Sequence, residues 1–361
     1  MSIRLPRNAQ IWLPGYVRSR AAQWFGPASG EQSPLVWIAI CDHYEPFWRN
    51  TDEELAQRRV ELWRTKWPEI ASRNRDSTGQ PAQYTFFYPE EEYRPHLLER
   101  LAEMARMGLG DVEVHIHHDG EGEQNFVDRM SRFLEALDRR HGLLRKQDGK
   151  YQFGFIHGNW ALDNSHPERR HCGLNNEITL LKNLGCYADF TMPSGASPTQ
   201  GRMVNVIYWA SDDPEQPKSY DTGVPVTIGA KLDADLLMIP GPLGLRWQER
   251  LLPRMETGEL AGHDLPTPYR ITRWLDLSPR IGRHIFIKLY THGTQERNSG
   301  PLLEGGLDRA FSLLAAECER RNCQARYVTA WQLRQAVEAL RLGQEPIIRR
   351  ASPVVRSFDP R

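Results

Sequence analysis

The stretch that decides the fold of this chain is Asp111-Val112-Glu113-Val114-His115-Ile116-His117-His118-Asp119-Gly120. Successive side chains of a β-strand point to opposite faces, so Val112, Val114 and Ile116 form one apolar face. The other face carries Glu113, His115 and His117, and histidine is the commonest metal ligand. The pattern predicts a barrel wall with helices on the apolar side and a metal on the other. His118 points to the helix side and Asp119 lies beyond the strand, so we expect neither to bind that metal.

Composition limits the class of protein. The chain has 361 residues, of which 40% are hydrophobic, so we expect a sizeable core. Lys plus Arg and Asp plus Glu number 46 each, a balance that provides no field attracting nucleic acid. No stretch approaches the roughly 20 apolar residues of a membrane span, and residues 1–20 contain no apolar core of a secretory signal.

Cysteine usage indicates the compartment. The five cysteines stand at irregular spacing and do not resemble a disulfide framework. We therefore expect reduced thiols and a cytoplasmic protein. The sequence carries no signal for an oligomeric state.

Strand patterns and helix patterns alternate along the chain. We expect strands at about 35–41, 83–88, 111–117, 151–156, 187–191, 235–239 and 285–290. We expect helices at about 52–72, 95–107, 122–141, 174–184, 305–321 and 329–342. Such alternation is typical of βαβ units, and it predicts an α/β fold with a parallel sheet.

The whole chain, 1–361, is expected to form a single domain. Its core covers about 34–330, and an extended tail covers about 345–361. Residues 193–231 are polar around one apolar run, which indicates an inserted hairpin or long loops. Residues 240–280 are rich in Pro and Gly and indicate a lid or a peripheral excursion.

Titratable residues recur where the expected strands end. In parallel α/β folds the chemistry lies at the carboxyl ends of the strands. The residues at these ends are Asp42, His43, His115, His117, His157, Asp189 and His292. A site built from imidazole and carboxylate suits zinc, and also nickel, cobalt or iron. Such a metal would lower the pKa of water and polarise a carbonyl, which is hydrolytic chemistry.

The order of these motifs resembles the polysaccharide deacetylase superfamily, over roughly residues 34–330. Ile40-Cys41-Asp42-His43-Tyr44-Glu45-Pro46 stands where the family has a strand ending in T-F-D-D-G. His115-Ile116-His117 is similar to the H-x-H version of its second motif. Asp189-Phe190-Thr191 and Tyr290-Thr291-His292-Gly293 are similar to its later motifs.

The resemblance implies a distorted (β/α)7-type barrel with inserted loops or a hairpin. It implies that Asp42 is the general base, that His115 and His117 bind the metal, and that His292 is the general acid. His43 stands where the family has its metal-binding aspartate. This departure leaves His43, Asp42 and Glu45 as alternatives for the metal ligand from the first strand.

Other residues favour recognition of a sugar. A Trp160 ring can pack on a pyranose, while Asn159 and Asp163 can bond hydroxyls. Glu45, His157 and Asp189 complete the expected substrate-binding set. Two competing patterns have simpler interpretations. Glu90-Glu91-Glu92 suits a charged helix start, and the polar loop with His166, His171 and Cys172 favours solvent over a second zinc site.

The leading hypothesis is a metal-dependent deacetylase of an N-acetylated sugar or polysaccharide, with a carbohydrate as its partner. One alternative is a metal-independent glycosidase that uses two carboxylates, Asp42 with Asp163 or Asp189. The other is a non-catalytic glycan-binding protein of a polysaccharide pathway, which the departure at His43 favours.

Overall fold

The computed structural model describes residues 5–25, 32–230, 234–247 and 253–347. Its strands are β1 (Leu35–His43), β2 (Thr85–Pro89), β3 (Asp111–Ile116), β4 (Arg145–Gln147), β5 (Lys150–His157), β6 (Cys186–Asp189), β7 (Tyr208–Ala210), β8 (Val224–Pro225), β9 (Leu236–Met238), β10 (Gly244–Arg246), β11 (Arg254–Glu256), β12 (Arg280–Ile281), β13 (His284–Thr291) and β14 (Gln324–Tyr327). Its α-helices are α1 (Ala9–Phe25), α2 (Glu53–Arg73), α3 (Pro95–Arg106), α4 (Glu123–Arg139), α5 (Glu177–Leu184), α6 (Pro268–Leu277), α7 (Glu296–Pro301), α8 (Leu307–Arg320) and α9 (Ala330–Arg341).

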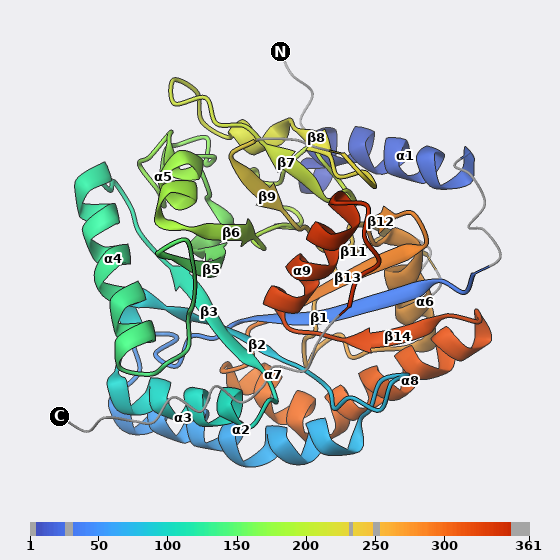
Figure 1. Ribbon diagram of the computed structural model, residues 1–361, viewed down its shortest axis with the longest axis horizontal. Helices are drawn as coiled ribbons and strands as arrows, with labels where there is room; N and C mark the ends of the chain where they lie inside the picture. The colour runs from blue at the N-terminus through green and yellow to red at the C-terminus, as the bar shows by residue number, and fades with distance from the viewer. Residues whose placement is uncertain (1–4, 26–31, 231–233, 248–252, 348–361) are drawn as a thin grey trace.

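A large, mostly parallel sheet organises these elements (Figure 1). Strands β13, β1, β2, β3, β5, β6 and β9 follow one another through parallel pairings. Antiparallel partners extend the two ends, β12 beside β13 and the pair β7 and β8 beyond β9. The expected α/β class is therefore confirmed, and the expected hairpin is present as β7 and β8.

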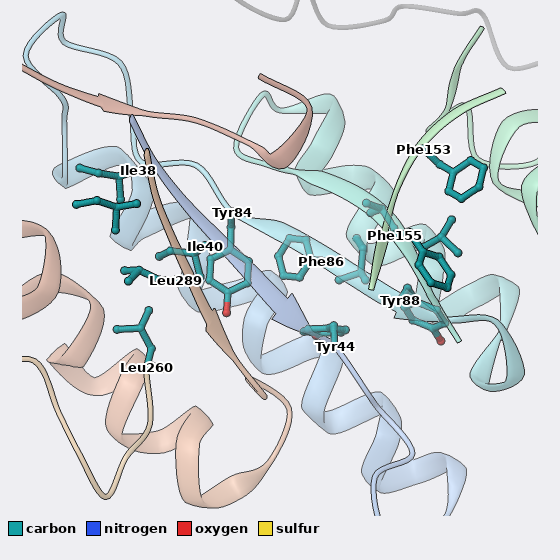
Figure 2. Close-up of a cluster of buried hydrophobic side chains, with 14 of the residues drawn as sticks. Ile38, Ile40, Tyr44, Tyr84, Phe86, Tyr88, Phe153, Phe155, Leu260 and Leu289 are labelled. Atoms are coloured by element: carbon teal, nitrogen blue, oxygen red, sulfur yellow. The ribbon is translucent and has the colours of Figure 1, made fainter. Parts of the chain in front are cut away.

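Two cores lie on the two faces of the sheet, because side chains alternate along each strand. Val36, Ile38 and Ile40 of β1 face the helix side, where Trp63 of α2 is fully buried. Figure 2 shows Ile38 and Ile40 beside Leu289 in this outer cluster. The residues of β1 that alternate with Val36, Ile38 and Ile40 belong to a second, inner cluster. Residues of α9 belong to the same inner cluster (Figure 1). The face of the sheet to which a side chain points therefore decides whether it packs in the outer or the inner cluster.

The register of the sheet gathers the strand ends along one edge. Asp42 at the end of β1 pairs with Thr291 of β13. His115 of β3 pairs with Ile156 of β5, and the next pair is Ile116 with His157. Residues far apart in sequence are thereby brought to one edge, as the strand-end pattern predicts.

Helix α1 lies outside the expected core range of 34–330 and was not predicted. It packs against the inserted segment, where Trp12 joins Val204 and Leu243 in a small cluster. Asn205 links the same parts, because its side-chain amide donates to Ser19 Oγ at 3.4 Å and to the Leu243 carbonyl at 2.9 Å. The N-terminal residues thus belong to the packed fold.

The described residues of the segment 240–280 include β10, β11 and α6. Of the expected tail, residues 348–361 lie outside the described residues. No helix in the described ranges combines the length and the apolar character that crossing a membrane requires.

Candidate metal centre

A polar cavity of about 1020 Å³ opens at the edge where the strands end. Six residues singled out in the sequence line it: His43, Glu45, His117, Asn159, Trp160 and His292. Its walls also include Trp48, Glu91, Glu92, Tyr290 and residues of the 240–280 segment. Of the seven residues expected at strand ends, His43, His117 and His292 line this cavity, and the roles of all of them remain predictions.

His115 and His117 point the same ring nitrogen towards one place. The Nδ1 of His115 donates to the Ile156 carbonyl at 2.8 Å, and the Nδ1 of His117 donates to Glu91. The Nε2 atoms of both rings lie 3.5 Å from Glu45 Oε1. A histidine that binds a metal usually donates its second ring N–H to a carbonyl or carboxylate, and both rings have that arrangement.

Glu45 and His43 complete this group from the first strand. A ligand atom from each of His43, Glu45 and His115 lies within 4.8 Å of the others. Burial alone would raise the pKa of Glu45, but His115 and His117 outweigh it and hold that pKa well below its usual range. Burial lowers the pKa of His43, and the neighbouring His292 and His115 lower it further. The carboxylate is thus ionised beside a neutral His43 at neutral pH.

His292 stacks on His43, with ring centroids 4.7 Å apart and planes inclined by 30°. Trp160 lies against both rings, at 5.9 Å from each centroid. Burial lowers the pKa of His292, so this ring is neutral at neutral pH and able to accept a proton. Its place in the cavity wall beside the His43 ring suits a group that exchanges protons with a bound molecule.

Asp42 does not line the cavity, although it was expected to act there as the general base. Its carboxylate is fully buried on the helix side of β1, where it accepts from the Gly293 amide at 2.7 Å and from the Tyr84 hydroxyl at 3.0 Å. The physical reason is strand alternation, since adjacent residues such as Asp42 and His43 point to opposite faces. Of the three alternatives for the ligand from the first strand, His43 and Glu45 face the centre.

Asn159 and Trp160 lie in the cavity wall, but three other expected substrate-binding residues do not. Asp163 is fully buried and accepts from the Ser219 amide at 2.6 Å. Asp189 is also buried and accepts from the hydroxyl of Thr191 at 2.6 Å. His157 is buried on the helix side of β5, beside Glu177. In the described structure these side chains bond within the protein rather than towards the cavity.

Glu91 is a residue of the centre that the sequence interpretation missed. The triplet Glu90–Glu92 forms a short 3-10 helix after β2, and Glu91 accepts from both the ring and the backbone amide of His117. Because the triplet follows the end of β2, the strand-end rule that selected the histidines would also have selected it. The charged-helix-start interpretation accounts for neither contact.

The donor set fits a divalent cation. Within the described part of the chain, the Nε2 atoms of His43 and His115 are buried without a hydrogen-bond partner. Unpartnered buried polar atoms are costly, and bound ions are one reason that they persist. A neutral His43 and an ionised Glu45 are also in the protonation states that a metal requires. Burial lowers the pKa of His117, but hydrogen bonds with Glu45 and Glu91 raise it to about 10, so this ring would release a proton on binding an ion. His43, Glu45 and His115 are therefore the residues that could hold an ion, and His117, whose Nε2 lies 3.5 Å from Glu45 Oε1, could join them.

Searches for relatives found no match to a protein-family model and no curated protein with significant similarity to this chain.

Proposed function

We propose that this protein is a metal-dependent hydrolase that removes the acetyl group from an N-acetylated carbohydrate. The observation that carries the proposal is the convergence of His115 Nε2 and His117 Nε2 on the Glu45 carboxylate, with the far side of each ring held by an acceptor. His43 and His292 stand next to this group in the same cavity wall.

Zinc is the proposed ion, held by His43, Glu45, His115 and His117. Nitrogen and oxygen donors of this kind suit zinc, and also nickel, cobalt or iron. When bound, a divalent ion supplies Lewis-acid chemistry, because it polarises a carbonyl oxygen and makes water a better nucleophile at neutral pH.

His292 is proposed to move the proton. As a neutral imidazole it accepts a proton from the attacking water, and as an imidazolium it returns that proton to the departing amine. Water adds to the amide carbon, the C–N bond breaks, and the products are acetate and the free amine. Asp42 is a positioning residue in this scheme, because it binds the backbone amide of the residue after His292.

A carbohydrate suits the remaining walls of the cavity. Trp160 and Trp48 are aromatic surfaces on which a sugar ring can stack, and Asn159 offers a side-chain amide to hydroxyl groups. The Arg49 and Arg297 guanidinium groups lie 4.3 Å and 5.7 Å from the Trp48 ring centroid, and both line the same cavity. This mixture favours a polar ligand with ring faces.

A distorted barrel is part of the proposal. Seven strands from β13 to β9 are joined by parallel pairings. The chain after β9 approaches β13 so closely that a Cβ on Gly241 would lie 2.5 Å from the Lys288 carbonyl oxygen. This close approach between the two ends of the parallel run supports closure.

The test combines metal analysis with acetate release from N-acetylated oligosaccharides. We expect wild-type protein to release acetate and the variant His115→Ala/His117→Ala to lose both this activity and its ion. The exposed His96→Ala is the matched control and should keep both. His292→Ala should keep the ion and lose activity by about 10²- to 10⁴-fold.

Two outcomes would replace this proposal by an alternative. Glycosidic cleavage that resists chelators would indicate a metal-independent glycosidase, although Asp42, Asp163 and Asp189 are not among the cavity-lining residues. Sugar binding without turnover across a panel of metals would indicate a glycan-binding protein.

A further inference from the structure

A second group of metal-binding side chains lies on the helix side of the sheet. It consists of His118, His157, Cys172 and Glu177, and one ligand atom from each lies within 4.8 Å of the others. His118 is 6% exposed and the other three are fully buried. Four buried titratable side chains in contact need a physical explanation, because unpaired charges and unsatisfied polar atoms are costly in a protein interior.

Strand alternation explains how the two histidines meet there. His118 lies two residues after Ile116 and four after Val114, so it points to the same face of the sheet as they do. His157 lies two residues after Phe155 and likewise shares its face. These three apolar residues belong to the outer cluster. The two imidazole centroids are 4.7 Å apart. Glu177 begins α5, and Cys172 comes from the loop before it. The group therefore joins two strand ends, a loop and a helix.

His157 presents a lone pair to a carboxylate. Its Nδ1 donates to the Gly158 carbonyl, so in the neutral ring Nε2 is an acceptor. This Nε2 is buried without a hydrogen-bond partner in the described structure and lies 3.4 Å from Glu177 Oε1. Two acceptors facing each other in a buried place repel, and a cation between them would turn the repulsion into attraction. His118 Nε2 donates a hydrogen bond of 3.0 Å to the same oxygen, and it would give up that proton to bind a cation there.

Backbone amides and Glu177 position the sulfur of Cys172, whose Sγ lies 3.4 Å from Glu177 Oε2. The backbone amides of Asn164 and Leu174 donate to its Sγ at 3.2 Å and 3.4 Å. Burial and Glu177 raise the pKa of this thiol well above its usual range while the two amides oppose the rise, so a bound cation would displace the thiol proton. The second oxygen of Glu177 is similarly held, because it accepts from the Asp163 amide at 2.7 Å. Backbone groups thus orient both side chains.

We propose that His118, His157, Cys172 and Glu177 bind a zinc ion that is separate from the centre in the cavity. Two imidazoles, one thiolate and one carboxylate supply four protein ligands, and a filled set of four is typical of a structural zinc site. The ion fixes the segment 158–176, which carries Asn159 and Trp160 into the cavity wall. This site differs from the weighed alternative of His166, His171 and Cys172, of which only Cys172 takes part.

Cobalt spectroscopy tests this site alone, because none of the proposed ligands of the cavity centre is a cysteine. We expect metal-free wild-type protein to take up cobalt with a thiolate-to-cobalt charge-transfer band that saturates by two equivalents, and at one equivalent in His115→Ala/His117→Ala. Zinc should displace the band. The band should vanish in Cys172→Ser and persist in Cys323→Ser, the matched control at another thiol.

Failure of the zinc-site proposal can be told apart from failure of the hydrolase proposal. In His115→Ala/His117→Ala the band should persist while the other ion is lost. Cobalt-loaded wild type without a thiolate band would overturn the zinc site and leave the hydrolase proposal standing, as would a band that survives in Cys172→Ser. The wild-type spectrum alone is decisive if Cys172→Ser does not fold.

Discussion

The backbone amide of Gly293 donates a hydrogen bond of 2.7 Å to the Asp42 carboxylate, which ties the turn carrying His292 to the end of β1. Asp42→Asn keeps an acceptor for this amide, whereas Asp42→Ala removes it. If the carboxylate positions the turn, we expect Asp42→Asn to retain most of the acetate-releasing activity and Asp42→Ala to lose much more. A loss of about 10²-fold or more in Asp42→Asn, with metal content unchanged, would instead identify a general base.

The burial of Asp42 also predicts a pH dependence of stability. Burial raises the pKa of Asp42 from 3.8 to about 8, although the Gly293 amide and the Tyr84 hydroxyl oppose the shift. The folded state therefore binds more protons than the unfolded state between these two values. The free energy of unfolding gained from this group is fully present below about pH 4 and is lost as the pH rises through 8.

Thermal unfolding of chelator-treated protein tests whether the stabilisation from Asp42 decreases as the pH rises. The Tm of wild type minus that of Asp42→Asn should fall between pH 4 and pH 8, because only wild type carries this titrating group. A difference that stays constant or rises over this range would contradict a raised pKa.

The ion pair between Glu91 and His117 predicts an effect on metal affinity. Glu91 accepts from the His117 ring and fixes which ring nitrogen faces Glu45. We expect Glu91→Gln to weaken zinc binding by about 10- to 100-fold, as loss of such supporting carboxylates does. Competition with a chelating dye measures this affinity. Glu90→Gln is the control, because Glu90 pairs with Arg129 instead and should leave affinity unchanged.

Glu256 predicts a large effect on stability. Its buried carboxylate accepts from Arg270 at 2.8 Å and 3.0 Å and from the Trp274 ring nitrogen at 3.0 Å. Glu256→Ala leaves the Arg270 charge buried without these bonds, so the free energy of unfolding should fall by about 3–5 kcal/mol. Denaturant unfolding measures the change. Exposed Glu304→Ala should change it by less than about 0.5 kcal/mol, and an equal effect of both would refute the argument.

The sequence predicted the order of the elements well, because hydrophobic period and strand ends are local properties. The expected strand at 35–41 is β1, and the expected helix at 329–342 is α9. Helix α1 escaped prediction because its residues carry no clear apolar stripe and Pro14 interrupts them. Its packing against Val204 is a long-range contact, which a local pattern does not contain.

Within the site, the alternation of side chains along each strand predicted their positions better than the resemblance to the family motifs did. It correctly placed Val112, Val114 and Ile116 in the outer cluster. The same rule, applied to the first strand, separates Asp42 from His43 and groups His43 with Glu45. It likewise sends His157 to the side of Phe155, away from the cavity. The strand-end rule could have selected Glu91, but its contact with His117 depends on how β2 and β3 pair, which no local pattern reveals.

The end of β3 has an evolutionary consequence. His115 and His117 point towards Glu45 while His118 points towards Glu177, so one short segment serves two different groups of side chains. A substitution at one of these positions damages one group. Insertion or deletion of a single residue within 111–116 would exchange the two faces and displace both groups together. Descendants of this chain should therefore vary in the length of their loops long before they vary in the length of this strand.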